Sequence, residues 1–202
     1  MADSTKIIVT TSDFYHHCLP VFFKQYAKYW DDPFELVGYK MPDIELPGNC
    51  LFVSLGKQRG PDYFGEDMRR YFSQQPGWFV WMMEDTFIKG FNKFAFNEME
   101  ALCHQGIGRI NLTTEGMKRG HYTGDHLYYV DQSAKYRLST QPSIWNKEFL
   151  LKYMKPGLTP WKFETQETND DYDVIGPLIN IVDHNEGVRK HNINELNLEG
   201  ID

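Results

Sequence analysis

Cysteine is scarce in this sequence, and long apolar runs are missing. Its three cysteines, Cys18, Cys50 and Cys103, lie far apart and form no C-x-x-C pair, which argues against a disulfide framework or a cysteine-based zinc site. No apolar run approaches the roughly 18 residues that span a bilayer, and the N-terminal MADSTK lacks the regions of a signal peptide. We therefore expect a cytoplasmic protein with no integral membrane segment, in which the cysteines act as small buried hydrophobes.

Basic residues and flexible stretches are also under-represented. The 202 residues carry 21 Lys and Arg against 28 Asp and Glu, a net charge of −7, which disfavours broad adhesion to nucleic acid or anionic lipid. No G-x-G-x-x-G follows the first apolar run, which weakens the case for a dinucleotide-dependent oxidoreductase. The absence of Pro/Gly/Ser-rich tracts and an aromatic content of 15% predict one folded domain with a well-filled core.

Short apolar runs alternate with helix-like segments through residue 114. The sequence predicts strands at 7–11, 34–39, 51–56, 78–83 and 107–114, and helices at 16–30, 60–74 and 91–105. This alternation indicates an α/β fold with a doubly wound, mostly parallel sheet. Beyond it we expect a small antiparallel hairpin formed by 127–131 and 136–141, and a helix over 144–154.

Two adjacent acids, Glu84 and Asp85, follow directly after the most apolar run of the chain, 78–83. Ligands of doubly wound sheets bind beyond the carboxyl ends of the strands. Carboxylates at such a place suit a hard divalent cation that bridges to phosphate oxygens. The alternative is that both acids merely end the strand in solvent.

A third acid, Glu164, ends the run PWKFE at 160–164. An acid that is partly desolvated beside Trp161 and Phe163 binds a proton more readily, which makes Glu164 a candidate general base. The alternative places the two rings in the core and Glu164 on the opposite, exposed face.

Together these segments resemble the short bacterial and viral glycosyltransferases of the GT-A fold. In that family a strand ends in an acidic pair, and an R-x-S-x-Q-x-x-x-W element later precedes a P-W-x-F-E element; here these are residues 137–145 and 160–164. The resemblance implies a single glycosyltransferase domain over 1–202. Residues 1–114 would then bind a nucleotide-sugar donor, and residues 115–202 would bind the acceptor and form the C-terminal tail.

The resemblance also implies roles for matched positions. Asp85, with Glu84 beside it, matches the motif that sets Mn²⁺ or Mg²⁺ against the donor diphosphate, although the family's Asp-any-Asp is here an adjacent pair followed by Thr86. Glu164 matches the base that deprotonates the acceptor hydroxyl in inverting members, and uridine diphosphate is the family's common leaving group. His184 matches a late histidine that some relatives use as a further metal ligand; the alternative is a surface histidine.

Other positions are candidates for substrate binding. The donor candidates are Thr10, Thr11, Ser12, Asp13, Lys57, Arg59 and Arg109. The acceptor candidates in the matched elements are Gln141, Trp145, Trp161 and Phe163. The alternatives are a helix N-cap at Ser12 and Asp13, a solvated basic loop around Lys57 and Arg59, and an ion pair for Arg109.

The sequence leaves two questions open: which acceptor is used, and whether the protein is catalytically active. A glycan or another hydroxyl compound fits, and some small viral transferases glycosylate hydroxylated bases in DNA; Lys118, Arg119 and His121, with Arg69 and Arg70, would then supply a phosphate-contacting face. A different class of function is a non-catalytic nucleotide-sugar-binding module. The sequence does not indicate an oligomeric state.

Overall fold

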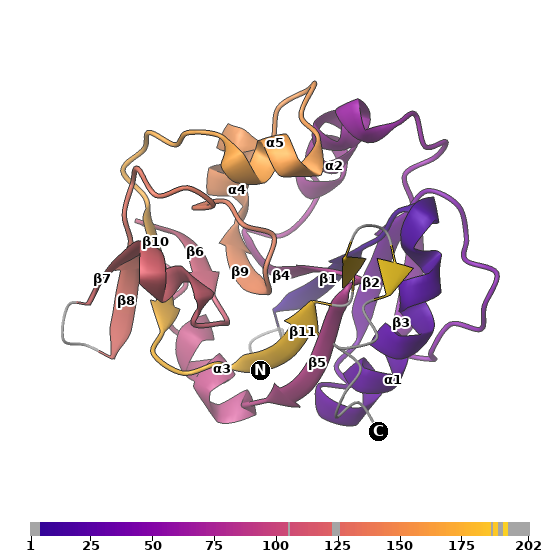
Figure 1. Ribbon diagram of the computed structural model, residues 1–202, viewed down its shortest axis with the longest axis horizontal. Coiled ribbons are helices and arrows are strands. Elements are labelled where there is room, and N and C mark those ends of the chain that lie inside the picture. The colour runs from indigo at the N-terminus through magenta and orange to yellow at the C-terminus, as the bar shows by residue number, and fades with distance from the viewer. Residues whose placement is uncertain (1–4, 105, 123–125, 187, 190–191, 194–202) are drawn as a thin grey trace.

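A nine-stranded sheet forms the centre of the protein. The computed structural model describes residues 5–104, 106–122, 126–186, 188–189 and 192–193. The strand order in the sheet is β3-β2-β1-β4-β9-β6-β10-β8-β7 (Figure 1). These strands are β1 (Lys6–Thr10), β2 (Phe34–Gly38), β3 (Cys50–Ser54), β4 (Trp78–Met83), β6 (Ile107–Asn111), β7 (Gly120–Tyr122), β8 (Leu127–Val130), β9 (Ser143–Asn146) and β10 (Asp173–Pro177).

The sheet is mostly parallel, as expected. The first four strands in sequence, β1 to β4, pair in parallel, and β10 is parallel to β6. Between these groups β9 runs antiparallel to both β4 and β6. At the edge of the sheet opposite β3, β8 pairs antiparallel with β10 and with the edge strand β7. The α/β fold class is therefore confirmed, and the sheet takes strands from both sides of residue 114.

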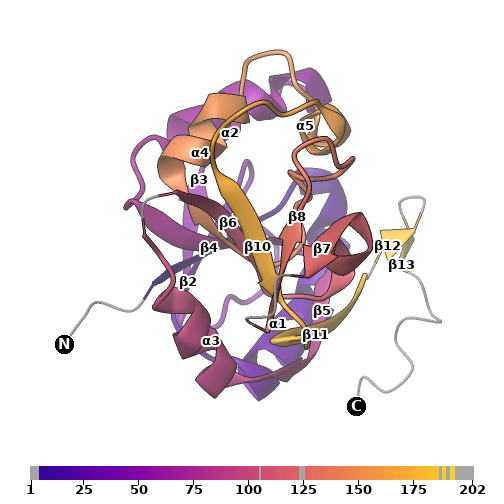
Figure 2. The same cartoon turned by 90° about the vertical axis from the view of Figure 1, so that its left-hand side faces the viewer.

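Helices cover both faces of the sheet (Figures 1 and 2). The face with α1 (Leu19–Tyr29) and α3 (Lys93–Glu100) also carries a two-stranded antiparallel sheet of β5 (Thr86–Phe91) and β11 (Val182–Glu186). The other face carries α2 (Phe64–Phe72), α4 (Lys147–Tyr153) and α5 (Pro160–Thr165). Short elements complete the chain: the 3-10 helices η1 (Asp13–Cys18), η2 (Pro61–Tyr63) and η3 (Glu115–Arg119), and the strands β12 (Val188–Arg189) and β13 (Asn192–Ile193).

Each face of the sheet has its own apolar core. Along β1 the side chains alternate, so that Ile7 and Val9 join the core under α1 whereas Ile8 joins the core under α2. The α2 face is unusually aromatic, with Trp81 packed against Phe72 and Trp145. Burial of each such side chain contributes roughly 1.5–3 kcal/mol before the entropy cost of ordering it. These two cores hold the carboxyl ends of β1, β2 and β4 in fixed positions.

The helix expected over 144–154 is present as α4 at Lys147–Tyr153, but its expected start and the second strand of the expected hairpin were wrong. Residues 143–146 form β9, not the start of a helix, because the side chain of Asn146 caps α4 by accepting hydrogen bonds from the backbone of Glu148 and Phe149. Residues 136–141 form no strand, and β8 pairs instead with β7 and β10. The described residues contain no helix that is long and apolar enough to cross a membrane.

The three cysteines are free thiols, and Cys18 is buried whereas Cys50 and Cys103 are half-buried. Burial raises the pKa of Cys18 and Cys103 to about 12 and that of Cys50 to about 11. None of them is therefore a thiolate nucleophile at neutral pH.

Candidate functional site

A cavity of about 230 Å³, here called the strand-end cavity, lies at the carboxyl ends of β1, β2 and β4. Its floor consists of Thr10, Thr11, Ser12, Tyr39, Met83 and Glu84. Its walls come from η1, from the loop after β3, from α2 and from the start of α5. Open α/β sheets bind their ligands at this edge, so three of the positions expected to contact a donor nucleoside line one cavity with Glu84.

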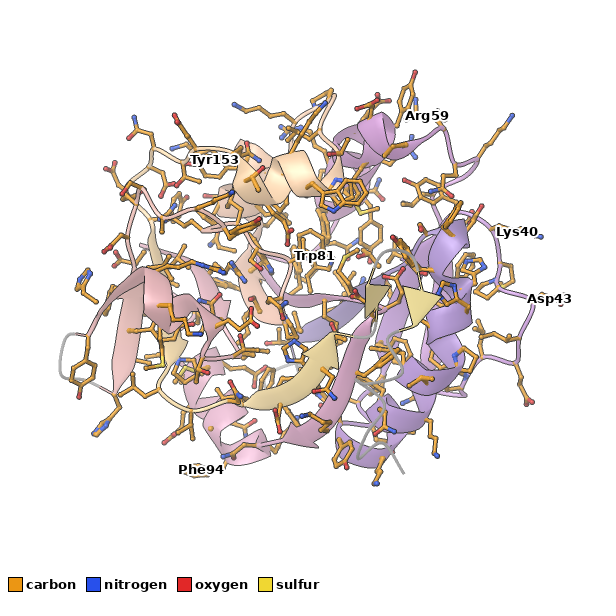
Figure 3. The ribbon with its side chains drawn as sticks, in the orientation of Figure 1. Lys40, Asp43, Arg59, Trp81, Phe94 and Tyr153 are labelled. Atoms are coloured by element: carbon orange, nitrogen blue, oxygen red, sulfur yellow. The ribbon has the colours of Figure 1, made fainter. Side chains whose placement is uncertain are left out.

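Hydrogen bonds tie the end of β1 to the end of β4. The Thr11 hydroxyl donates to Glu84 Oε1 at 3.3 Å, and the Ser12 backbone N–H lies 3.4 Å from the same oxygen. Within the same two strands, Trp81 Nε1–H of β4 donates to Thr10 Oγ1 of β1 at 2.9 Å, and Figure 3 shows Trp81 in the layer between the sheet and α5. The floor of the cavity is thus a pre-ordered polar seam beneath largely apolar walls.

Glu84 is the buried acid of this seam, with only 2% of its surface exposed. Burial, followed by the charge of Asp85, raises the pKa of Glu84 well above its ordinary value. The same two acids, after burial, raise the pKa of Tyr15 on the neighbouring wall. A cation or a hydrogen-bond donor from a ligand would relieve this concentration of negative charge, which is a property expected of a binding site.

The acid pair forms the tight turn between β4 and β5, and Asp85 is half-buried. His184 lies on β11 opposite Ile88 of β5, so it shares a two-stranded sheet with the residues that follow Asp85. Across the described part of the chain, no group of three or more His, Cys, Asp or Glu side chains is arranged to hold a metal ion. The two carboxylates alone fit an ion such as Mg²⁺, which commonly binds through one or two carboxylates and completes its shell with waters and substrate phosphates.

Aromatic rings form the rim of the strand-end cavity. Phe14 and Tyr15 line it from η1, and Trp161 lines it from the first turn of α5. Phe14 and Trp161 are 73% and 60% exposed, so packing alone does not account for their positions. Exposed rings beside an apolar cavity offer stacking surfaces to a planar ligand. Trp161 therefore borders the cavity of the donor candidates, whereas it was expected to contact the acceptor.

The basic loop after β3 does not match its expected role. Of its residues 57–59, only Gln58 lines the strand-end cavity. The Arg59 guanidinium donates to Asp67 at 2.6 Å and to Glu66 at 3.0 Å, at the α2 end of the loop (Figure 3). Because both acids belong to α2, Arg59 anchors the loop instead of facing a phosphate, and Lys57 is an exposed side chain outside the cavity lining.

Asp13 is also engaged outside the cavity. Its Oδ1 accepts a hydrogen bond from the Lys40 backbone N–H at 3.0 Å and lies 3.8 Å from His16 Nε2. Ser12 occupies the N-cap position of η1 but its side chain makes no capping hydrogen bond. The alternative of a helix N-cap therefore holds for the position of Ser12 but not for a hydrogen bond to its side chain. Asp13 ties η1 to the segment after β2.

A second, smaller cavity, here called the polar pocket, lies beyond the carboxyl end of β6. It holds about 10 Å³ and is lined by polar side chains that include Arg109, Asn111, Glu115, Arg119, Ser139 and Gln141. Arg109 and Gln141, which were expected on the donor and the acceptor side respectively, therefore meet in one pocket. Neither residue lines the strand-end cavity.

Glu164 lies beside the loop that lines the polar pocket. Its Oε1 accepts hydrogen bonds from the Thr140 backbone N–H at 2.6 Å and from the Thr140 hydroxyl at 2.7 Å. Thr140 stands between Ser139 and Gln141, both of which line the pocket. One turn earlier on α5, Trp161 lines the strand-end cavity. The short helix α5 thus contributes to the strand-end cavity at one end and supports the polar pocket at the other.

Two expected acceptor contacts are corrected by burial. Trp145 and Phe163 are both 0% exposed and pack against Trp81 in the core under α5. They present no surface to a ligand because the sheet and the helices enclose them. Arg137 of the same sequence element is likewise buried, in an ion pair with Asp170 at 2.9 Å.

Phe14, Tyr15 and Tyr39 are among the residues of the strand-end cavity that sequence inspection missed. Phe14 and Tyr15 follow the predicted strand 7–11 within a few residues, and Tyr39 ends the predicted strand 34–39. Proximity to a strand end is the same signal that identified Glu84. The Tyr39 hydroxyl also donates to the buried Asp67 at 3.3 Å, which links the cavity wall to the Arg59 anchor.

No protein-family model and no curated protein matches the sequence. Among solved structures, the chain resembles an active-site mutant of LgtC, with 12% identity, 83% of this chain and 68% of that chain covered, and a TM-score of 0.43. It also resembles the mannosyltransferase PcManGT from Pyrobaculum calidifontis in complex with GDP-Man and Mn²⁺, with 10% identity, coverages of 92% and 57%, and a TM-score of 0.44. A 4-diphosphocytidyl-2C-methyl-D-erythritol synthase from Anaerococcus prevotii is similar at 12% identity, coverages of 98% and 96%, and a TM-score of 0.43.

Proposed function

We propose that this protein is a glycosyltransferase that moves a sugar from a nucleoside-diphosphate donor, with UDP as the leaving group, to a hydroxyl of an acceptor. The observation that carries the proposal is the strand-end cavity, in which the carboxyl end of β1 meets the buried Glu84 after β4. Ligand sites of doubly wound sheets occupy this edge. The acidic pair gives this edge its expected chemistry, and Trp161 of the later P-W-x-F-E element lines the same cavity.

The strand-end cavity suits the nucleoside part of the donor. Its volume of about 230 Å³ is just below the roughly 300–1,000 Å³ of complete small-molecule sites, so the cavity takes part of the donor and the remainder extends past the acid pair. The base stacks against the exposed rings at the rim, and Ser12 and the Thr11 hydroxyl meet the ribose.

The diphosphate lies at the turn between β4 and β5. Glu84 and Asp85 would hold Mg²⁺ or Mn²⁺ there, and the ion would neutralise charge on the departing diphosphate. The chain's own part is to keep both carboxylates at the strand end, with Thr11 and the Ser12 backbone fixing one oxygen of Glu84. We place His184 close to this turn because β11 pairs with β5, the strand that follows Asp85.

We assign the proton transfer to Glu164. Its Oε1 is held by Thr140, and no hydrogen bond from the described residues engages Oε2, which accepts the proton of the acceptor hydroxyl. As that proton leaves, the acceptor oxygen bonds to the anomeric carbon, and the bond from this carbon to the diphosphate breaks with its electron pair moving to the diphosphate. Attack from the side opposite the diphosphate inverts the configuration. The two cavities at either end of α5 would keep donor and acceptor on opposite sides of the reacting carbon.

The experiment is a panel of nucleotide sugars screened by thermal unfolding with and without Mn²⁺, followed by a transfer and hydrolysis assay on every nucleotide sugar that binds. A true ligand raises Tm because it binds only the folded chain. Phe94→Ala, on the exposed side of α3, serves as a surface control that leaves the response unchanged. No shift with any nucleotide sugar would refute the proposal, and binding without turnover would identify a non-catalytic module.

A further inference from the structure

The polar pocket contains a buried positive charge for which the described residues supply no anionic partner. Arg109 on β6 is only 2% exposed. Its Nε and one terminal nitrogen donate to the Ser143 hydroxyl at 2.9 and 2.8 Å, and the other terminal nitrogen donates to the Arg137 carbonyl at 3.0 Å. Both acceptor oxygens, the Ser143 hydroxyl and the Arg137 carbonyl, are neutral. Within the described residues no carboxylate forms an ion pair with Arg109.

A buried guanidinium without a negatively charged partner destabilises the folded state. A guanidinium has five N–H donors, and the described hydrogen bonds use three of them, which leaves one N–H on each terminal nitrogen. Burial lowers the pKa of Arg109 to about 9, so the side chain keeps its charge at neutral pH. The Trp145 ring, 4.7 Å from the guanidinium carbon, supports the cation but does not neutralise it.

The surroundings of the pocket add positive charge on one side and hydroxyl-binding groups on the other. Arg119 lines the pocket with its guanidinium over the Tyr136 ring at 5.1 Å. The acids that face this region are Glu115, an exposed side chain at the mouth, and Glu164, whose charge acts on Arg109 from the Thr140 side. Asp170 forms a buried ion pair with Arg137 and not with Arg109.

We propose that the polar pocket binds an anionic group, a carboxylate or a phosphate, carried by the hydroxylated acceptor. This inference rests on the proposed function and names the class of acceptor. The two remaining N–H groups of Arg109 are charged donors for an oxygen of such a group, and Arg119 adds the second cation. Hydroxyls of the same acceptor then meet Glu115 at the mouth and the basic oxygen of Glu164.

The size of the pocket selects the group that enters. A volume of about 10 Å³ holds about one water-sized group, so an oxygen of the anion enters and the sugar ring stays outside. The ring is then held at the surface between the pocket and α5. An acidic sugar therefore binds by one buried anchor, with its hydroxyls left accessible to the donor.

The test is an NMR titration of the full chain with glucuronate, glucose 6-phosphate and glucose, following the Nε–H signal of Arg109. Glucuronate or glucose 6-phosphate should shift this signal and bind with an affinity at least about tenfold higher than that of glucose, because charge-assisted hydrogen bonds are stronger than neutral ones. The tighter of the two identifies the anion. Equal affinity for glucose and both acidic sugars, or an unmoved Arg109 signal, would overturn the proposal.

Three variants locate the effect. Arg109→Lys keeps the charge but loses the planar guanidinium donors, and Arg119→Gln removes a half-buried charge outside the core. Each should reduce the preference for acidic sugars severalfold. Lys24→Gln, on the exposed side of α1, removes the same charge elsewhere and should leave the preference intact. A preference that survives both arginine variants would overturn the assignment. If Arg109→Lys fails to fold, the affinities of Arg119→Gln and the Arg109 Nε–H signal of the wild-type chain still test the proposal.

A parallel titration with UDP separates this inference from the proposed function. Acidic sugars that bind to a chain without UDP affinity would refute the donor assignment and leave the anion pocket standing. UDP binding with no preference for acidic sugars would refute the anion pocket alone.

Discussion

Replacing Trp161 by alanine tests whether the strand-end cavity binds a nucleoside. A Trp side chain has roughly 250 Å² of surface, and at 60% exposure about 150 Å² of this is open. A base that covers half of the open surface, about 75 Å², gains ~2 kcal/mol at 25 cal/mol per Å², equivalent to about thirtyfold in affinity. We therefore expect Trp161→Ala to weaken UDP binding by about thirtyfold, with little change in Tm because the ring lies outside the core.

The measurement is isothermal titration calorimetry with UDP, beside thermal unfolding of each variant. Phe94→Ala is the matched control, since Phe94 is 73% exposed on α3, on the opposite face of the sheet from α5. In the wild-type chain, UDP should also quench the fluorescence of the exposed Trp161. An affinity that changes by less than about twofold in a folded Trp161→Ala protein would refute the stacking argument.

Three further substitutions test the remaining assignments. Glu164→Gln should lower kcat by about 10²–10⁴-fold while the Kd for UDP stays constant, since the amide oxygen still accepts from Thr140; normal turnover would exclude this base. Asp85→Ala should abolish the Mn²⁺-dependent part of UDP affinity, measured with and without EDTA, and an unchanged metal response would remove Asp85 from the diphosphate site. Asp170→Asn should destabilise the fold by roughly 3–5 kcal/mol at pH 7 because it leaves the buried Arg137 uncompensated, as measured by urea unfolding.

The Asp170 variant also carries a pH signature. Burial alone would raise the pKa of Asp170, but the hydrogen bonds from Arg137 and Tyr153 outweigh it and lower the pKa below the ordinary 3.8. A carboxyl with a lowered pKa contributes stability that is present above its unfolded-state pKa and is lost as the pH falls through the folded value. The wild-type chain should therefore lose stability below about pH 3.8, and Asp170→Asn should lose less. Equal acid sensitivity of the two proteins would contradict this reasoning.

The parallel half of the sheet was predictable because each strand is a short apolar run that ends at a polar residue. Glu84 was found by the same rule, since it is the first acid after the most apolar strand. Strand β9 was missed because Ile144 and Trp145 belong to a run whose apolar spacing also fits a helix, and its strand partners β4 and β6 are distant in sequence. The short-range spacing of apolar residues does not indicate which distant strands will pair.

The candidate site was predictable in position but not residue by residue. Trp145, Trp161 and Phe163 look alike in the sequence, yet only Trp161 is exposed. Trp145 is buried because β9 lies in the middle of the sheet, and the orientation of α5 places Phe163, not Trp161, in the core. Arg59 was expected near the donor phosphates, but in the structure it pairs with two acids of α2. Charge pairing and burial of this kind depend on tertiary contacts, which single residues do not reveal.

The position of β9 has a consequence for how the chain folds. Because β9 lies between β4 and β6, residues 1–111 leave the ribosome with both of these strands lacking their shared neighbour. Their open edges are pairing surfaces for other chains, and Trp81 lacks the ring of Trp145 that packs against it. Non-local pairing of this kind slows folding. We expect the sheet to close only after residue 146 has emerged, so that both halves of the chain become ordered in one late, cooperative step.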